Sequence, residues 1–170
     1  MIRAARRAIA VALALAFAVL AAPASAGPPY LTDDPAPTDT GHWEIYGFAT
    51  AEGRGGSFDG VTGLDLNYGP VPGVQLTATL PVEFADSGTA AFGNLELGVK
   101  YRFFHREKAG LSAAIFPRII LPTGPGGGPA AYLLPVWVQK EIGKWSVFGG
   151  GGYTINPGAG NRDYAVGGIA

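Results

Sequence analysis

Apolar and polar side chains alternate strictly along the stretch NLELGVKYRFF, from Asn94 to Phe104. One parity carries Leu95, Leu97, Val99, Tyr101 and Phe103, and the other carries Asn94, Glu96, Gly98, Lys100 and Arg102. Because successive side chains of an extended chain point to opposite faces of a sheet, this pattern predicts a strand with one apolar face and one polar face. An α-helix, at 3.6 residues per turn, would scatter the apolar positions around its circumference.

The same kind of run recurs along the chain. Seven complete runs are followed by an eighth that begins near Tyr164 and continues to Ala170. The complete runs cover residues 42–50, 61–68, 74–84, 94–104, 111–121, 131–140 and 145–155. No stretch after residue 41 has a convincing helical period, so the sequence predicts an all-β fold of about eight strands.

The connections between these runs are alternately short and long. The short ones are residues 69–73, 105–110 and 141–144, and the longer ones are residues 51–60, 85–93, 122–130 and 156–163. Antiparallel outer-membrane barrels have short turns on the periplasmic side and longer loops outside. The alternation therefore predicts an up-and-down antiparallel transmembrane β-barrel over residues 42–170.

The pattern of one strand does not say whether its apolar face meets lipid or a protein core. If the apolar parities faced inward, the chain would be a soluble, lipocalin-like periplasmic barrel that binds an apolar ligand. Three features favour lipid: the runs have the 8–11 residues needed to cross a bilayer at a tilt, aromatic residues lie near run ends, and only 15% of residues are charged. We therefore expect the apolar parities to face outward, towards outer-membrane lipid.

The first 26 residues have the three parts of a secretory signal peptide. Arg3, Arg6 and Arg7 precede an unbroken apolar run, residues 8–22, and Ala24-Ser25-Ala26 is a small-residue cleavage site. Cleavage after Ala26 would leave residues 27–41 as an extended leader rich in Pro and Asp. This leader could dock a periplasmic partner, plug the lumen or stay disordered. Because it has no apolar period, disorder is the expectation.

Composition excludes several kinds of function. The chain has 12 basic and 13 acidic residues, and three of the basic ones lie in the signal peptide. The mature protein is therefore acidic and lacks the basic patch that nucleic acids require. It has no Cys and only two His, so neither a disulfide framework nor a metal site is expected, and nothing indicates a cofactor. Ser112 and Ser146 have no evident His partner, which argues against an enzyme, although a lipid-modifying barrel enzyme stays an alternative.

The polar parities provide candidate lumen-lining residues. They are Glu44, Asp65, Asn67, Gln75, Thr77, Glu96, Lys100, Arg102 and Arg118. Such a set can form a charged constriction that selects solutes by sign and size. It can equally form an internal network of hydrogen bonds and ion pairs that fills a narrow barrel. Both interpretations are open from the sequence.

Three segments carry a resemblance to a known family. They are the opening GPPYLTDDPAPTDTGHWEIY at residues 27–46, GNLELGVKYRF at residues 93–103, and KWSVFGGGGYTIN at residues 144–156. With them, the chain resembles the exported proteobacterial barrels grouped under the meta-pathway of phenol degradation and often described simply as transporters. The resemblance implies an outer-membrane channel for small molecules, with aromatic or other hydrophobic nutrients as the solute class, and no catalytic residues.

The sequence thus predicts a channel that passes small solutes by diffusion and has lipid as its surroundings. Outer-membrane barrels usually finish on a strand with a terminal aromatic residue, whereas this sequence finishes as GGIA within its eighth run. An open sheet in lipid would leave backbone groups unpaired at a cost of several kcal/mol each. We therefore expect the barrel domain to be incomplete at its C-terminal end, with the total strand number and the oligomeric state undetermined.

Overall fold

A computed structural model describes residues 33–54, 57–85 and 88–170. The predicted signal peptide, and residues 27–32 of the leader, lie outside this part of the chain. The strands are β1 (Trp43–Arg54), β2 (Ser57–Val71), β3 (Val74–Ala85), β4 (Ala90–Phe92), β5 (Leu95–Arg106), β6 (Leu111–Ile115), β7 (Arg118–Leu121), β8 (Ala131–Ile142), β9 (Trp145–Ile155) and β10 (Tyr164–Ile169). One short 3₁₀-helix, η1 (Glu107–Ala109), lies between β5 and β6, and no helix among the described residues is long and apolar enough to cross a membrane.

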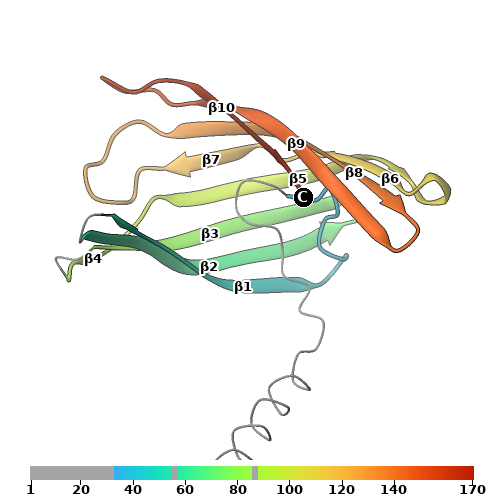
Figure 1. The fold of residues 1–170 in the computed structure, drawn as a ribbon, viewed down its shortest axis with the longest axis horizontal. Helices are drawn as coiled ribbons and strands as arrows, with labels where there is room; N and C mark the ends of the chain where they lie inside the picture. The colour runs from blue at the N-terminus through green and yellow to red at the C-terminus, as the bar shows by residue number, and fades with distance from the viewer. Residues whose placement is uncertain (1–32, 55–56, 86–87) are drawn as a thin grey trace, which may run out of the picture.

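All ten strands belong to one antiparallel sheet in which chain neighbours are spatial neighbours (Figure 1). The order is β1-β2-β3-β5-β6-β8-β9-β10, and β4 extends the pairing of β3. β6 and β7 both pair with β5 and β8, so they are two halves of one strand interrupted at Phe116 and Pro117. The eight positions along the sheet correspond to the eight runs of the sequence, which confirms the all-β antiparallel prediction.

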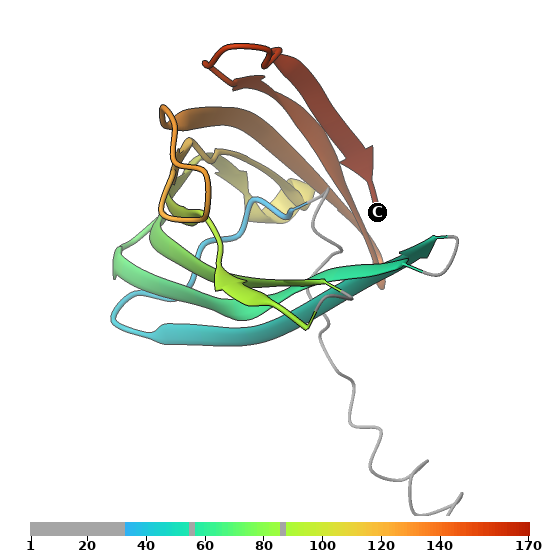
Figure 2. The same cartoon turned by 90° about the vertical axis from the view of Figure 1, so that its left-hand side faces the viewer.

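The sheet curls into a partial ring, which is visible when it is viewed from its end (Figure 2). In the described part of the chain no ladder joins β1 to β10, which are the two edges of the sheet. We call the inner side of this ring the concave face and the other side the outward face.

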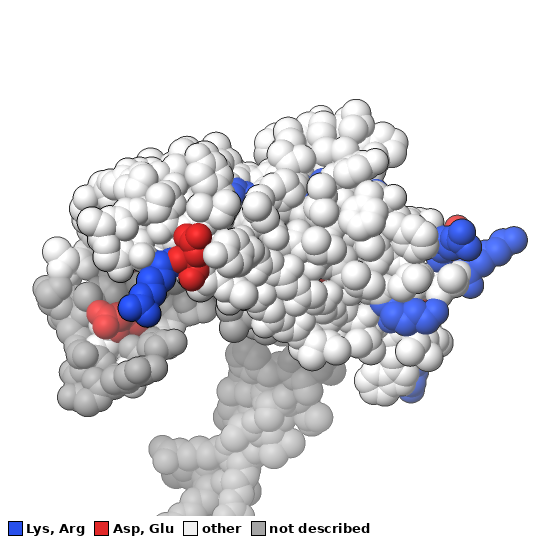
Figure 3. Space-filling model, turned by 90° about the horizontal axis from the view of Figure 1, so that it is seen from above, with Lys and Arg blue, Asp and Glu red and all other residues white. Residues whose placement is uncertain are grey.

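The two faces have inverted polarity compared with a water-soluble protein. The outward parity is apolar and exposed, as at Leu97, which is 39% exposed. The concave parity is polar and buried, as at Asn67 and Lys100, which are 3% and 4% exposed. On the face seen in Figure 3, charged side chains gather at the two ends and the broad region between them is almost free of charge. On β2, β3 and β5 burial thus follows the polar parity, whereas the buried concave residues of β8, Pro135 and Trp137, are apolar.

Short turns occupy one end of the sheet, as predicted, and each depends on a left-handed glycine. Gly73, Gly110 and Gly143 have φ values of 80°, 56° and 61° at the connections β2–β3, β5–β6 and β8–β9. This region of φ is open to Gly at little steric cost, so these turns can be tight.

The predicted long connection at residues 51–60 is wrong. β1 and β2 continue through it as a paired hairpin, with Ala51 opposite Gly60 and Arg54 opposite Ser57. The Gly content of this segment suggested a loop, but glycine forms the same main-chain hydrogen bonds as any other residue. The predicted long connection at residues 85–93 is wrong in part, because β4 lies within it and pairs with β3. The longer connections at residues 122–130 and 156–163 lie at the end opposite the short turns.

Aromatic rings on the concave face lie over glycines of neighbouring strands. A Cβ added to Gly98 would come within 2.8 Å of the Phe116 ring, and one added to Gly63 within 2.9 Å of the Phe48 ring. Trp137 covers Gly150 in the same way, at 2.9 Å. Ring-over-glycine pairs of this kind fix the register and curvature of β-sheets.

Replacing Gly150 by Ala should destabilise the sheet. The new Cβ would overlap the Val136 carbonyl oxygen, so backbone as well as the Trp137 ring must move. We expect a loss of about 1–3 kcal/mol in the free energy of unfolding, measured by urea titration of the refolded protein. Gly47→Ala is the matched control, because nothing lies within 4 Å of its added Cβ. Equal effects of the two substitutions would contradict the proposed ring-over-glycine packing.

Candidate functional site

The concave face carries a connected network of neutral polar side chains on β2 and β3. Gln75 Nε2 donates to Asn67 Oδ1 at 2.7 Å and to Thr77 Oγ1 at 3.0 Å, and Thr77 Oγ1 donates to Asn67 Oδ1 at 2.6 Å. Asp65 extends the network by accepting from Asn67 Nδ2 at 3.0 Å and from Thr79 Oγ1 at 2.7 Å. Because buried polar groups are costly without partners, this network fixes the side chains relative to each other.

The leader docks on this network, so the expectation of disorder is wrong for residues 33–41. Thr38 is buried, and its amide donates to Gln75 Oε1 at 2.9 Å. Its hydroxyl lies 3.0 Å from Glu44 Oε2 and 3.2 Å from Gln75 Oε1. Pro35 is fully buried, and the Gly41 amide donates to the Gly69 carbonyl at 2.7 Å. A segment without an apolar period can still be ordered when a polar surface provides its partners.

A second cluster joins the leader to β5 and β7 through charges. Lys100 Nζ lies 3.0 Å from Asp33 Oδ1, and Arg118 Nη2 lies 3.5 Å from Asp33 Oδ2. Arg118 Nη1 also forms an ion pair with Glu96 Oε1 at 2.8 Å. The Phe116 ring lies beside both cations, with its centroid 3.9 Å from Arg118 Cζ and 5.0 Å from Lys100 Nζ. These distances are in the range of cation–π contacts.

All nine predicted lumen-lining residues can be placed in the structure. Eight belong to these two clusters: Glu44, Asp65, Asn67, Gln75 and Thr77 around the neutral network, and Glu96, Lys100 and Arg118 in the charged one. The ninth, Arg102, is half-buried on β5, and no side-chain partner is found for it among the described residues. Sequence reasoning missed Asp33, Thr38 and Phe116. The only available signals were the acidic TDDP opening and the thin polar parity of residues 111–121.

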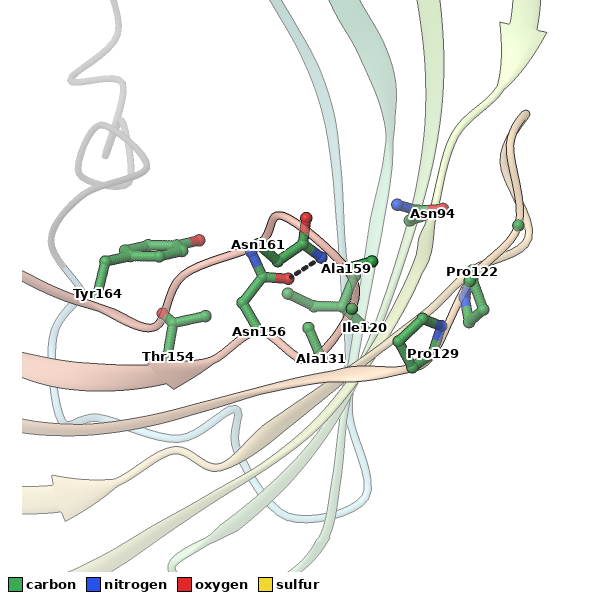
Figure 4. A pocket seen from close by; sticks show the side chains of 13 residues that line it. Asn94, Ile120, Pro122, Pro129, Ala131, Thr154, Asn156, Ala159, Asn161 and Tyr164 are labelled. Carbon is green, nitrogen blue, oxygen red and sulfur yellow. Dashed lines mark hydrogen bonds between the residues drawn. The ribbon is translucent and has the colours of Figure 1, made fainter.

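A pocket of about 450 Å³ lies at the end of the sheet that carries the longer connections (Figure 4). Its polar lining is neutral: Asn94, Asn156, Asn161, Thr154 and Tyr164. Asn161 Nδ2 donates to Asn156 Oδ1 at 3.4 Å and to the Pro157 carbonyl at 3.0 Å, which orders the β9–β10 connection. The pocket therefore offers amide and hydroxyl groups, whereas the charges lie deeper on the concave face.

One pairing corrects the sequence interpretation of the serines. Ser112 does have a His partner, because His105 Nδ1 lies 2.8 Å from Ser112 Oγ across β5 and β6. The two residues face each other in the β5–β6 ladder, next to the turn that joins these strands. Within the described residues no carboxylate is hydrogen-bonded to His105, whose side chain is exposed, so the orienting third group of a nucleophilic site is not found.

The structure likewise contains, in the ranges it describes, no cluster of three or more His, Cys, Asp or Glu residues that could hold a metal ion. No protein-family model, curated protein or solved structure matches this chain. The arrangement of side chains is therefore the basis for assigning a function.

The neutral network predicts that Thr77→Val destabilises the fold. Valine keeps the shape but leaves Asn67 and Gln75 each without one buried partner, which should cost about 1–3 kcal/mol. Urea unfolding monitored by tryptophan fluorescence measures this loss. Thr50→Val, at an exposed position of β1, is the control and should change stability by less than about 0.5 kcal/mol. A Thr77→Val protein as stable as the control would mean that the network does not support the fold.

Proposed function

We propose that this chain forms an outer-membrane β-barrel, exported through its N-terminal signal peptide, that passes small solutes by diffusion along its polar concave face. The observation that carries the proposal is the inverted polarity of the sheet. Side chains such as Leu97, Val99 and Val136 are exposed on the outward face, while Asn67 and Lys100 are buried on the concave face. A contiguous apolar surface of this extent is a liability in water, whereas lipid would cover it.

The distribution of aromatic and charged residues along the strands supports the same environment. Trp43 and Trp145 are both exposed on the outward face, Trp145 at 69%, at the end that carries the short turns. Trp43 also packs against Tyr68, with ring centroids 4.8 Å apart. Tryptophan and tyrosine are enriched at membrane–water interfaces, and charged groups favour the water beyond them. The charge-free region of Figure 3 would then lie in the hydrocarbon layer.

Closure of the ring is part of this proposal. β1 and β10 each leave one edge without a partner strand in the described residues. In lipid every unpaired backbone group costs several kcal/mol, so both edges must pair with further strands, either of the same polypeptide or of a second copy.

A lipocalin-like binder and a lipid-modifying enzyme agree less well with the side chains of the sheet. A lipocalin-like binder of an apolar ligand needs an apolar cavity, whereas this concave face buries Lys100 and the network around Gln75. A lipid-modifying enzyme would need a third group for His105 and Ser112. The resemblance to transporters linked with phenol degradation supports small aromatic or hydrophobic nutrients as the solutes, and the ring of Phe116 inside the sheet is compatible with them.

Substituting Leu97 by Arg tests the lipid contact. Leu97 pairs with Ala78 and Ile119, in the middle of the sheet. In a bilayer the buried charge should cost about 2–4 kcal/mol of unfolding free energy, compared with about 0–1 kcal/mol for Val71→Arg near the short turns. Urea unfolding from lipid vesicles measures both. If the protein were water-soluble, both exposed positions would tolerate Arg to within about 0.5 kcal/mol, and the proposal would fail.

Cell fractionation tests location and closure together. We expect the mature protein in the outer-membrane fraction, with a band on a denaturing gel that shifts on boiling, because closed barrels resist unfolding by detergent until they are heated. The mass of the boiled band shows whether one polypeptide provides all strands. Recovery only from the soluble periplasm would overturn the proposal.

A further inference from the structure

A single carboxylate of the leader bridges two cations of the sheet. Each oxygen of Asp33 faces one of them, Oδ1 facing Lys100 Nζ at 3.0 Å and Oδ2 facing Arg118 Nη2 at 3.5 Å. The leader also provides the Ala36 carbonyl, 3.4 Å from Lys100 Nζ. Asp33 is thus held as a bound carboxylate would be, by one cation on each oxygen.

The sheet alone builds the receiving half of this arrangement. With the leader docked, Lys100 is 4% exposed and Phe116 is 2% exposed. Arg118 forms an ion pair with Glu96 through Nη1 and with Asp33 through Nη2. Its buried Nε has no hydrogen-bond acceptor among the described residues. A buried ammonium requires an anion or other acceptors. Displacement of Asp33 would free Arg118 Nη2 to donate to a ligand.

The charge balance near this site is positive once the leader is set aside. Lys100 and Arg118 then face Glu96, the one carboxylate of β5 or β7 in the cluster. The carboxylates on β1 and β2 are engaged elsewhere: Glu44 with Thr38 and Tyr46, and Asp65 with Asn67 and Thr79. Asp33 of the leader restores neutrality.

Burial of the Asp34 carboxylate opposes docking of the leader. Burial raises the pKa of Asp34, which the positive charge of Lys100 only partly opposes, and the neighbouring Asp33 and Glu44 raise it further. A carboxyl whose pKa is raised on docking is easier to bury when protonated, so at neutral pH the Asp34 charge weakens docking. Asp33 and Asp34 therefore act in opposite directions on the same segment.

We infer that Lys100, Arg118 and the Phe116 ring form a binding site for a small carboxylate anion, and that Asp33 of the leader occupies this site as a built-in competitor. The site would serve a solute in transit or a ligand of a soluble protein equally, so this inference does not depend on the proposed transport.

Titration with acetate tests the site on the full mature chain, purified in detergent and free of other carboxylates. In isothermal calorimetry the wild type should bind acetate weakly, because acetate competes with Asp33 at an intramolecular effective concentration in the millimolar range. Asp33→Asn removes the competitor and should tighten binding by about tenfold or more. Adding Lys100→Gln to Asp33→Asn should abolish this gain.

Asp34→Asn is the matched control, because it removes a neighbouring negative charge but can still accept the Ala36 N–H that now bonds Asp34 Oδ1 at 2.7 Å. It should strengthen leader docking and weaken acetate binding below that of the wild type. Tighter binding by both single variants would show general charge attraction and overturn the inference. So would unchanged binding by Asp33→Asn.

A second measurement does not need Asp33 to be altered. The chain has no Cys, so Thr38→Cys places a single thiol at a buried leader position. If acetate displaces Asp33, it should accelerate modification of this thiol by a water-soluble reagent, whereas ethylammonium chloride at the same ionic strength should not. Equal rates with both salts would contradict displacement.

Discussion

The ladder of main-chain hydrogen bonds between neighbouring antiparallel strands is the interaction on which this structure depends. Among the described residues only Ala114, Phe116 and Trp137 form a buried hydrophobic core, far too few to hold a sheet of this size. Apolar side chains that would form the core of a soluble protein point away from the concave face. The ladder therefore has to be complete along each strand, and the concave side chains have to satisfy each other.

That dependence explains how much of the structure the sequence could reveal. Strand pairing of consecutive runs needs only local information, so the alternation at residues 94–104 was sufficient to identify β5 and its two faces. The same parity identified Lys100 and Gln75 as concave residues. The hairpin at residues 51–60 was not predictable in this way, because glycines break the side-chain pattern without breaking the hydrogen bonds.

Contacts between distant segments were out of reach for a different reason. Asp33 contacts Lys100, which lies 67 positions further along the chain. No periodicity in residues 27–41 predicts that contact. Such contacts follow from three-dimensional complementarity of charge, which a linear pattern does not record.

The position of the leader has a consequence for the order of assembly. Asp33 and Thr38 contact side chains of β1, β3, β5 and β7, so their binding surface exists only after those strands have paired. Closing loops of this length before the sheet forms would cost chain entropy with no contact in return. Residues 33–41 therefore dock after the strands that follow them in the sequence have paired. A docked leader therefore indicates that the strands from β1 to β7 have paired.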